Sequence, residues 1–173
     1  MSPKSKQPVP QWLREAQPEE VVATAIARER GAARRYAAMA RSAEDRVVKA
    51  KLRYLAAEEG EHARLLRAMA KALPRPRQDF RPPAGSAEAR GDWDRPSVQQ
   101  ALDMAIRSER EARSLYESAA SLCRHAKSRG VFRELARAEE RHEMLLRQEL
   151  SLQRDQQGWR GLLGTVWSEE DFW

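Results

Sequence analysis

Two short runs of the sequence, EEGEH at residues 58–62 and EERH at residues 139–142, place glutamates beside two of the three histidines. Three glutamates in the first run are candidates to act with His62, and Glu139 lies three residues before His142. Residues three apart on an α-helix share a face, so such a pair can direct a carboxylate and an imidazole to one point. These groups bind iron, manganese and zinc. Each run is therefore a candidate half of a metal site.

An internal repeat selects one glutamate in the first run. The segment AIARERGAARRY aligns with AIRSEREARSLY, and LAAEEGEHARLLR aligns at the same offset with LARAEERHEMLLR. In this alignment Glu59 and His62 recur as Glu139 and His142, whereas the other two glutamates of the first run align with alanine and arginine. The repeat indicates a duplicated helical hairpin that retains one Glu-x-x-His pair in each half.

Each half carries a further glutamate well upstream of its Glu-x-x-His pair. Glu29 precedes Glu59 by the same number of positions as Glu109 precedes Glu139, and this equal spacing predicts the same depth in both hairpins. Four carboxylates and two imidazoles from four helices are therefore expected to converge. Two shared cations would neutralise carboxylates that otherwise repel one another in a buried site. The arrangement matches that of ferritin-like di-iron and di-manganese bundles.

Apolar residues at three- to four-residue spacing predict four long helices, two within 18–73 and two within 97–152. The connection at 74–96 is rich in proline, glycine and arginine, where a helix cannot persist. Short, long and short connections predict an all-α, ferritin-like four-helix bundle, built from two repeated hairpins joined by a long crossover connection. The same connection is long enough to reach a second chain, which would permit helix swapping.

Helix boundaries follow from capping patterns and proline. Pro18 suits a first helical turn, and Ser42 with Asp45 resembles a capping box at the start of the second helix. Ser97 with Gln100 resembles another at the start of the third helix, and the fourth helix is expected to end near residue 152.

The two ends of the chain lack this periodic pattern. Residues 1–17 are expected to form a flexible N-terminal arm. Residues 153–173 form a tail with three of the five tryptophans. This Trp-rich tail could cover the end of the bundle, pack on a second subunit, or dock on a shell or partner protein.

Composition limits the class of protein. A length of 173 residues fits one domain, and the single cysteine, Cys123, excludes an internal disulfide framework and a cysteine-based metal cluster. No apolar stretch approaches the roughly 20 residues needed to span a bilayer, and the polar start lacks a signal-peptide core, so we expect a cytoplasmic protein. The net charge of +6 is spread along the helices, which favours a solvated surface over a nucleic-acid site.

These motifs resemble those of the rubrerythrin-type branch of the ferritin-like superfamily, over roughly residues 19–150. The resemblance rests on AIxxExxxxxxY in both halves and on the Glu-x-x-His motifs in AEEGEHARLL and AEERHEMLL. It implies a centre of two iron ions, with manganese or zinc as substitutes, bridged by Glu59 and Glu139. The implied metal ligands are Glu29, Glu59, His62, Glu109, Glu139 and His142.

By the same resemblance, Tyr36 and Tyr116 are expected to hydrogen-bond to ligand carboxylates. Each lies seven residues after the upstream glutamate of its half, two turns along the same helix face. Such a contact would orient the carboxylate toward the metal.

The chain departs from the family pattern at two points. Rubrerythrins usually add a seventh carboxylate in an E-x-x-E arrangement, but Ile106 and Ala112 occupy the positions three residues either side of Glu109. A redox-linked ligand switch is therefore not predicted. The sequence also has no Cys-x-x-Cys pair of the rubredoxin type, so we expect a separate electron-donor protein.

The leading functional hypothesis is a non-haem di-iron oxidoreductase that reduces hydrogen peroxide or dioxygen at this centre. One alternative is an iron-binding or storage protein, or the cargo of a protein shell, with ferroxidase activity. Another is a structural bundle that buries a hydrogen-bonded polar network. We expect a homodimer, with helix swapping as one arrangement, and no nucleic-acid partner.

Overall fold

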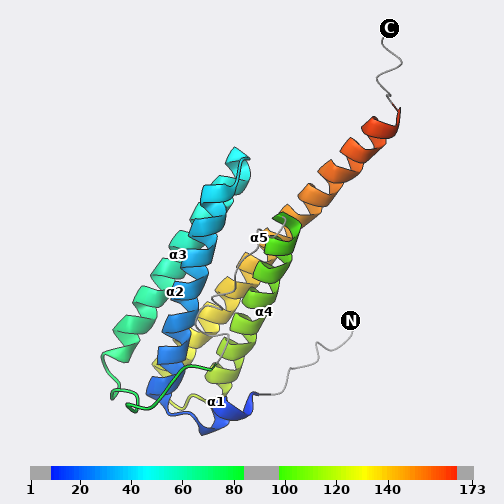
Figure 1. Ribbon diagram of the computed structural model, residues 1–173. Helices are drawn as coiled ribbons and strands as arrows, with labels where there is room; N and C mark the ends of the chain where they lie inside the picture. The colour runs from blue at the N-terminus through cyan, green and yellow to red at the C-terminus, as the bar shows by residue number, and fades with distance from the viewer. Residues whose placement is uncertain (1–8, 84–97, 167–173) are drawn as a thin grey trace.

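The computed structural model describes residues 9–83 and 98–166, with side chains described as far as residue 155. Four long helices dominate it: α2 (Pro18–Ser42), α3 (Arg46–Ala70), α4 (Val98–Leu122) and α5 (Ala126–Val166). Helix α2 packs along α3 and helix α4 along α5, so the chain forms two helical hairpins (Figure 1). This confirms the predicted all-α, ferritin-like bundle.

The two hairpins pack with α2 antiparallel to α4, as the colour gradient in Figure 1 shows. A short helix, α1 (Gln11–Glu15), precedes α2 and contacts α4, and its Leu13 is buried in the core. The predicted N-terminal arm therefore contains an ordered turn that its sequence did not indicate. Lys51 on α3 donates to Glu149 on α5 at 2.7 Å, so the hairpins are also linked between α3 and α5.

Local signals account for the helix starts. Pro18 opens α2, where Gln17 and Glu20 form a capping box. The predicted capping box of Ser42 with Asp45 is wrong, because Ser42 is the last residue of α2 and Asp45 is itself the N-cap of α3. One Asp45 carboxylate oxygen accepts the backbone N–H groups of the second and third residues of α3, at 2.8 and 2.9 Å. The box predicted at Ser97 lies outside the described residues.

Helix α5 continues to Val166, beyond the end expected near Leu152. Residues 152–157 contain no proline or glycine, so nothing in that stretch interrupts the helix. The division of the chain into arm, bundle and tail stays a prediction. Within the described residues, no helix is both long enough and apolar enough to cross a membrane.

The core consists of two apolar clusters, one toward each end of the bundle. On α2 the first cluster reaches Ala25 and the second begins at Ala32. On α4 the second cluster ends at Ile106 and the first begins at Ala112. On α3 and α5, the gap between the residues of the two clusters likewise contains the Glu-x-x-His motif. The fold thus places one polar layer between the two apolar clusters.

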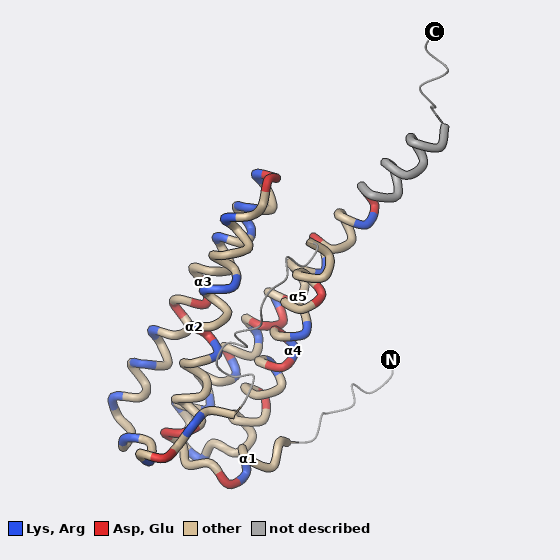
Figure 2. The backbone as a smooth tube through the Cα atoms, viewed as in Figure 1, with Lys and Arg blue, Asp and Glu red and all other residues tan. Residues whose placement is uncertain are grey.

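Basic and acidic residues are interspersed along all four long helices (Figure 2). This agrees with the expectation of a mixed, solvated surface.

Candidate metal centre

Six residues fill the polar layer between the apolar clusters, and they are the six that the repeat predicts. The four glutamates and His142 are at most 2% exposed, and the side chain of His62 is 12% exposed. Because burying a charged carboxylate in an apolar layer is costly, each of these groups requires a partner. The residues are Glu29 on α2, Glu59 and His62 on α3, Glu109 on α4, and Glu139 and His142 on α5.

The six residues form two overlapping groups, each with potential ligand atoms within 4.8 Å of one another. The first group contains Glu29 and His62, and the second contains Glu109 and His142. Glu59 and Glu139 belong to both. Each group therefore offers three carboxylates and one imidazole, a donor set that suits iron, manganese or zinc.

The two shared glutamates turn one oxygen toward each histidine. Glu59 places Oε2 3.3 Å from Nδ1 of His62 and Oε1 3.0 Å from Nδ1 of His142. Glu139 places Oε1 3.8 Å from Nδ1 of His62 and Oε2 3.6 Å from Nδ1 of His142. Ligand atoms that each lie about 2.1 Å from one metal are roughly 3 Å apart, so these separations are close to those of a metal shell.

The rings of His62 and His142 stack with their centroids 5.5 Å apart and their planes inclined by 22°. Both rings direct Nδ1 at the carboxylates, so each histidine can serve one of two neighbouring cations. The pseudo-symmetry of the sequence repeat thus reappears in the arrangement of the site.

Several buried atoms of the cluster lack a hydrogen-bond partner among the described residues. They are Oε2 of Glu29, Oε2 of Glu109, Oε1 of Glu139 and Nε2 of His142. The three carboxylate oxygens have an imidazole Nδ1 nearby, at 3.3 Å for Glu29, 3.6 Å for Glu109 and 3.8 Å for Glu139, but none accepts a hydrogen bond from a described residue. A polar network that satisfied itself would hold each buried oxygen in a hydrogen bond, since its absence costs free energy. Cations between the carboxylates would satisfy these oxygens, so the residues present fit a two-metal centre.

The pKa values show how the cluster holds protons without metal. Burial and the neighbouring Glu59 raise the pKa of Glu29 to about 8. Burial, the adjacent Glu109 and nearby negative charge raise the pKa of Glu139 well above its usual value. Burial by itself would also raise the pKa of Glu59, but hydrogen bonds with Glu29 and both histidines lower it overall. Glu59 is thus ionised, while Glu29 and Glu139 carry protons.

The histidines shift in the opposite sense to burial. Burial by itself would lower the pKa of His62, but the adjacent carboxylates of Glu29 and Glu59 raise it to about 9. The same balance, with Glu109, Glu139 and Glu59 as partners, raises the pKa of His142 to about 12. Both imidazoles are therefore protonated at neutral pH, and a metal ion must displace their protons.

The two tyrosines are fully buried and each hydrogen-bonds to a glutamate of the other hairpin. Tyr36 on α2 donates to Oε1 of Glu109 on α4, and Tyr116 on α4 donates to Oε1 of Glu29 on α2. Antiparallel packing of α2 against α4 produces this exchange. Burial and the accepting carboxylate raise the pKa of each tyrosine well above 10, so both hydroxyls remain donors.

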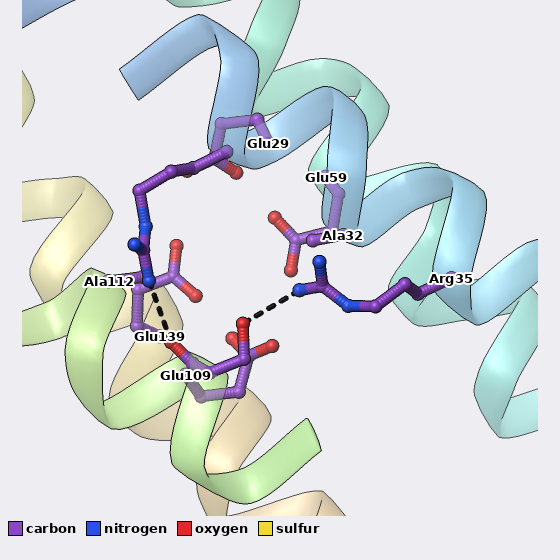
Figure 3. Close-up of a pocket in the computed structure, with 9 residues that line it drawn as sticks. Glu29, Ala32, Arg35, Glu59, Glu109, Ala112 and Glu139 are labelled. Carbon is purple, nitrogen blue, oxygen red and sulfur yellow. Dashed lines mark hydrogen bonds between the residues drawn. The ribbon is translucent and has the colours of Figure 1, made fainter. Parts of the chain in front are cut away.

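A pocket opens onto the cluster between α2 and α4, and three of its residues were not anticipated from the sequence (Figure 3). These are Arg28, Arg35 and Ser108. These three residues belong to no sequence motif, and arginine is common throughout this chain. Only the packing of α2 against α4 shows that they line the pocket.

The other chemical candidates in the sequence lie elsewhere. Glu58 and Glu61 belong to neither carboxylate group, and Glu61 pairs with Arg64 at the surface. His125 is exposed and contacts Ser128. The structure therefore makes the same selection among the glutamates of the first run as the repeat does.

Comparisons with known proteins agree with this geometry. The sequence profile of the rubrerythrin family matches residues 20–150. A hypothetical protein from Pyrococcus furiosus has a similar solved structure, with 24% sequence identity, a TM-score of 0.65, and coverage of 80% of this chain and 91% of that chain. At this identity the likeness concerns the fold. No curated protein matches the chain.

Proposed function

From the premise that the chain belongs to the rubrerythrin family, we propose that it is a non-haem di-iron oxidoreductase that reduces hydrogen peroxide or dioxygen. The observation that carries this proposal is the pair of buried ligand groups that share Glu59 and Glu139. One carboxylate oxygen directed to each side is the arrangement that bridging two cations requires.

Each half of the centre has its own pair of terminal groups. Glu29 and His62 would hold one metal, and Glu109 and His142 the other, with Glu59 and Glu139 between them. When bound, two iron ions would supply the two electrons that reduction of peroxide to water consumes. Manganese and zinc suit the same donors, so the metal itself is part of the proposal.

The residues around the ligands would support this chemistry by holding the site rigid and dry. Tyr36 and Tyr116 fix one oxygen of Glu109 and of Glu29, which leaves the other oxygen of each carboxylate for a metal. The two apolar clusters exclude water above and below the polar layer. Each hydroxyl bridges the two hairpins, so metal binding and hairpin packing should reinforce each other.

Electrons would come from a separate donor protein, since the sequence given has no Cys-x-x-Cys pair of the rubredoxin type. We further propose that the protein works in the cytoplasm as a homodimer, with exchange of hairpins through the long connection as one form. Light scattering of the purified protein would measure the oligomeric state.

Metal content and oxidant reactivity test the function together. The protein is loaded with ferrous iron without oxygen and then mixed rapidly with peroxide or dioxygen. We expect two irons per chain and an absorbance change with at least one oxidant. Two irons and no change with either oxidant would refute the oxidoreductase assignment. Binding of many irons per chain, in a particle that grows with iron, would favour the storage alternative.

A further inference from the structure

The pocket between α2 and α4 has a floor, walls and a mouth of different chemistry. The floor consists of the four carboxylates of the centre, and the walls include Ala32 and Ala112 (Figure 3). The methyl groups of these alanines leave room beside the carboxylates. Arg28 and Arg35 from α2 and Ser108 from α4 complete the lining.

The two arginines bring positive charge that is only weakly compensated. Arg35 donates to the neutral hydroxyl of Ser108 at 2.7 Å and forms no ion pair with a described carboxylate. Arg28 reaches the backbone oxygen of Ser108 and a carboxylate oxygen of Glu111, both at 3.4 Å. Glu111 is 69% exposed, so solvent screens this ion pair.

The arginines also break the sequence repeat that governs the rest of the site. The metal-facing glutamates, the histidines, the tyrosines and the alanine walls all recur in the second half at the offset of the repeat. At the same offset, Arg28 is replaced by Ser108 and Arg35 by Leu115. Duplication of the hairpin therefore accounts for the metal ligands and not for the charged mouth.

We propose that this pocket is a binding subsite for a small anion, selected by Arg35 and Arg28, which reaches the metal pair from the side of α2 and α4. The inference rests on the proposed function. Four ionised carboxylates and two divalent cations balance in formal charge, so the loaded floor is neutral and the two guanidinium groups leave the pocket positive. In a partly buried site such charge attracts anions strongly.

The ligand class follows from the lining. The pocket is bounded by two alanines and has room for about one water molecule, so it admits at most an anion of two or three atoms. Arg35 can exchange its hydrogen bond with the Ser108 hydroxyl for a charge-assisted bond to that anion. His62 on α3 and His142 on α5 do not line this pocket, so an incoming ligand would enter on the side of the centre away from the histidines.

Azide and nitric oxide serve as an anionic and a neutral probe of similar size. Azide is titrated into the full-length protein loaded with two cobalt ions per chain, and its binding is followed through the visible absorption of the metal. Nitric oxide is titrated into the ferrous-loaded protein without oxygen. The variant R35Q removes the proposed anion contact, and R28Q removes the second charge. The control R30Q removes the same charge from an exposed position on the same helix.

We expect R35Q to bind azide about 10- to 100-fold more weakly, which is the range for loss of one hydrogen bond to a charged group. R28Q should show a smaller loss in the same direction, and it carries the test if R35Q does not fold. R30Q should bind azide within about 2-fold of the natural sequence, because a screened surface charge contributes little. Nitric oxide affinity should not change in any variant.

Equal azide affinity in R35Q, R28Q and R30Q would overturn the proposal. An equal loss for azide and nitric oxide would also overturn it, since Arg35 would then act by shaping the metal centre. Failure of azide to bind a natural chain that holds two cobalt ions would refute the anion subsite and leave the metal centre standing. Failure to bind metal at all would refute the proposed function itself.

Discussion

Metal binding should release about four protons per chain at pH 7. Without metal, the raised pKa values keep protons on Glu29, Glu139, His62 and His142, while Glu59 is already ionised. A carboxylate and an imidazole nitrogen must both be deprotonated to bind a cation, so two divalent ions must displace all four protons. This corresponds to two protons for each metal ion.

The pH dependence of metal affinity follows from this number. Two protons displaced per metal should make the apparent affinity rise by about two orders of magnitude for each pH unit between 6 and 8. Above pH 8 the slope should decrease, because Glu29 (pKa about 8) and then His62 (pKa about 9) lose their protons before metal is added.

Zinc is the suitable ion for this measurement, since it binds the same donors without oxidation. Proton release is followed in weakly buffered solution with a pH indicator, and affinity by competition with a chelator of known protonation. The variant E61A is the matched control, because Glu61 lies two residues from Glu59 and is exposed. Release of one proton or fewer at pH 7, or an affinity that stays constant from pH 6 to 8, would refute the proposed proton distribution.

Three further predictions concern the cluster and its supports. E59A should lose both metal ions because Glu59 belongs to both ligand groups, whereas E61A should retain two; metal analysis after gel filtration distinguishes them. Y36F removes the hydrogen bond from Tyr36 to Glu109 and leaves a buried carboxylate oxygen without it. This should destabilise the metal-free protein by about 1–3 kcal/mol in urea unfolding. An unchanged unfolding midpoint would contradict a stabilising role of this hydrogen bond. The metal-free protein should lose stability as the pH rises from about 6 to 9. The pKa values of Glu29 and His62 are raised by folding, so over this range the folded state binds more protons than the unfolded state. A thermal melting temperature that rises over this range would contradict the prediction.

The ligand residues could be predicted from the sequence because their relation is local and repeated. Helix geometry places Glu59 and His62 on one face whatever the rest of the fold does. The constant offset of the repeat then identifies Glu139 and His142 as a second pair, and the equal spacing from Glu29 to Glu59 and from Glu109 to Glu139 sets the depth of each upstream glutamate on its partner helix. Hairpin geometry and periodicity together were sufficient to predict the polar layer.

Contacts between the hairpins were not accessible in this way. The seven-residue spacing placed Tyr36 on the same helix face as Glu29, but its actual acceptor is Glu109 on the other hairpin. The positions of Arg28 and Arg35 at a pocket mouth likewise depend on Ser108 from that hairpin. Short helix α1 and the Asp45 cap show the same limit on a smaller scale, because several residue types satisfy a helix end equally well.

The sequence by itself determined which residues could bind metal and on which helix faces they lie, since the helical repeat and the duplication set these relations within each hairpin. The structure places Glu59 and Glu139 in both ligand groups, as the family resemblance implied. Only the tertiary structure decided that each tyrosine serves the opposite half and that one side of the centre opens beside two arginines. These features depend on how α2 and α4 meet, and the register between two packed helices is set by side-chain packing over their whole length.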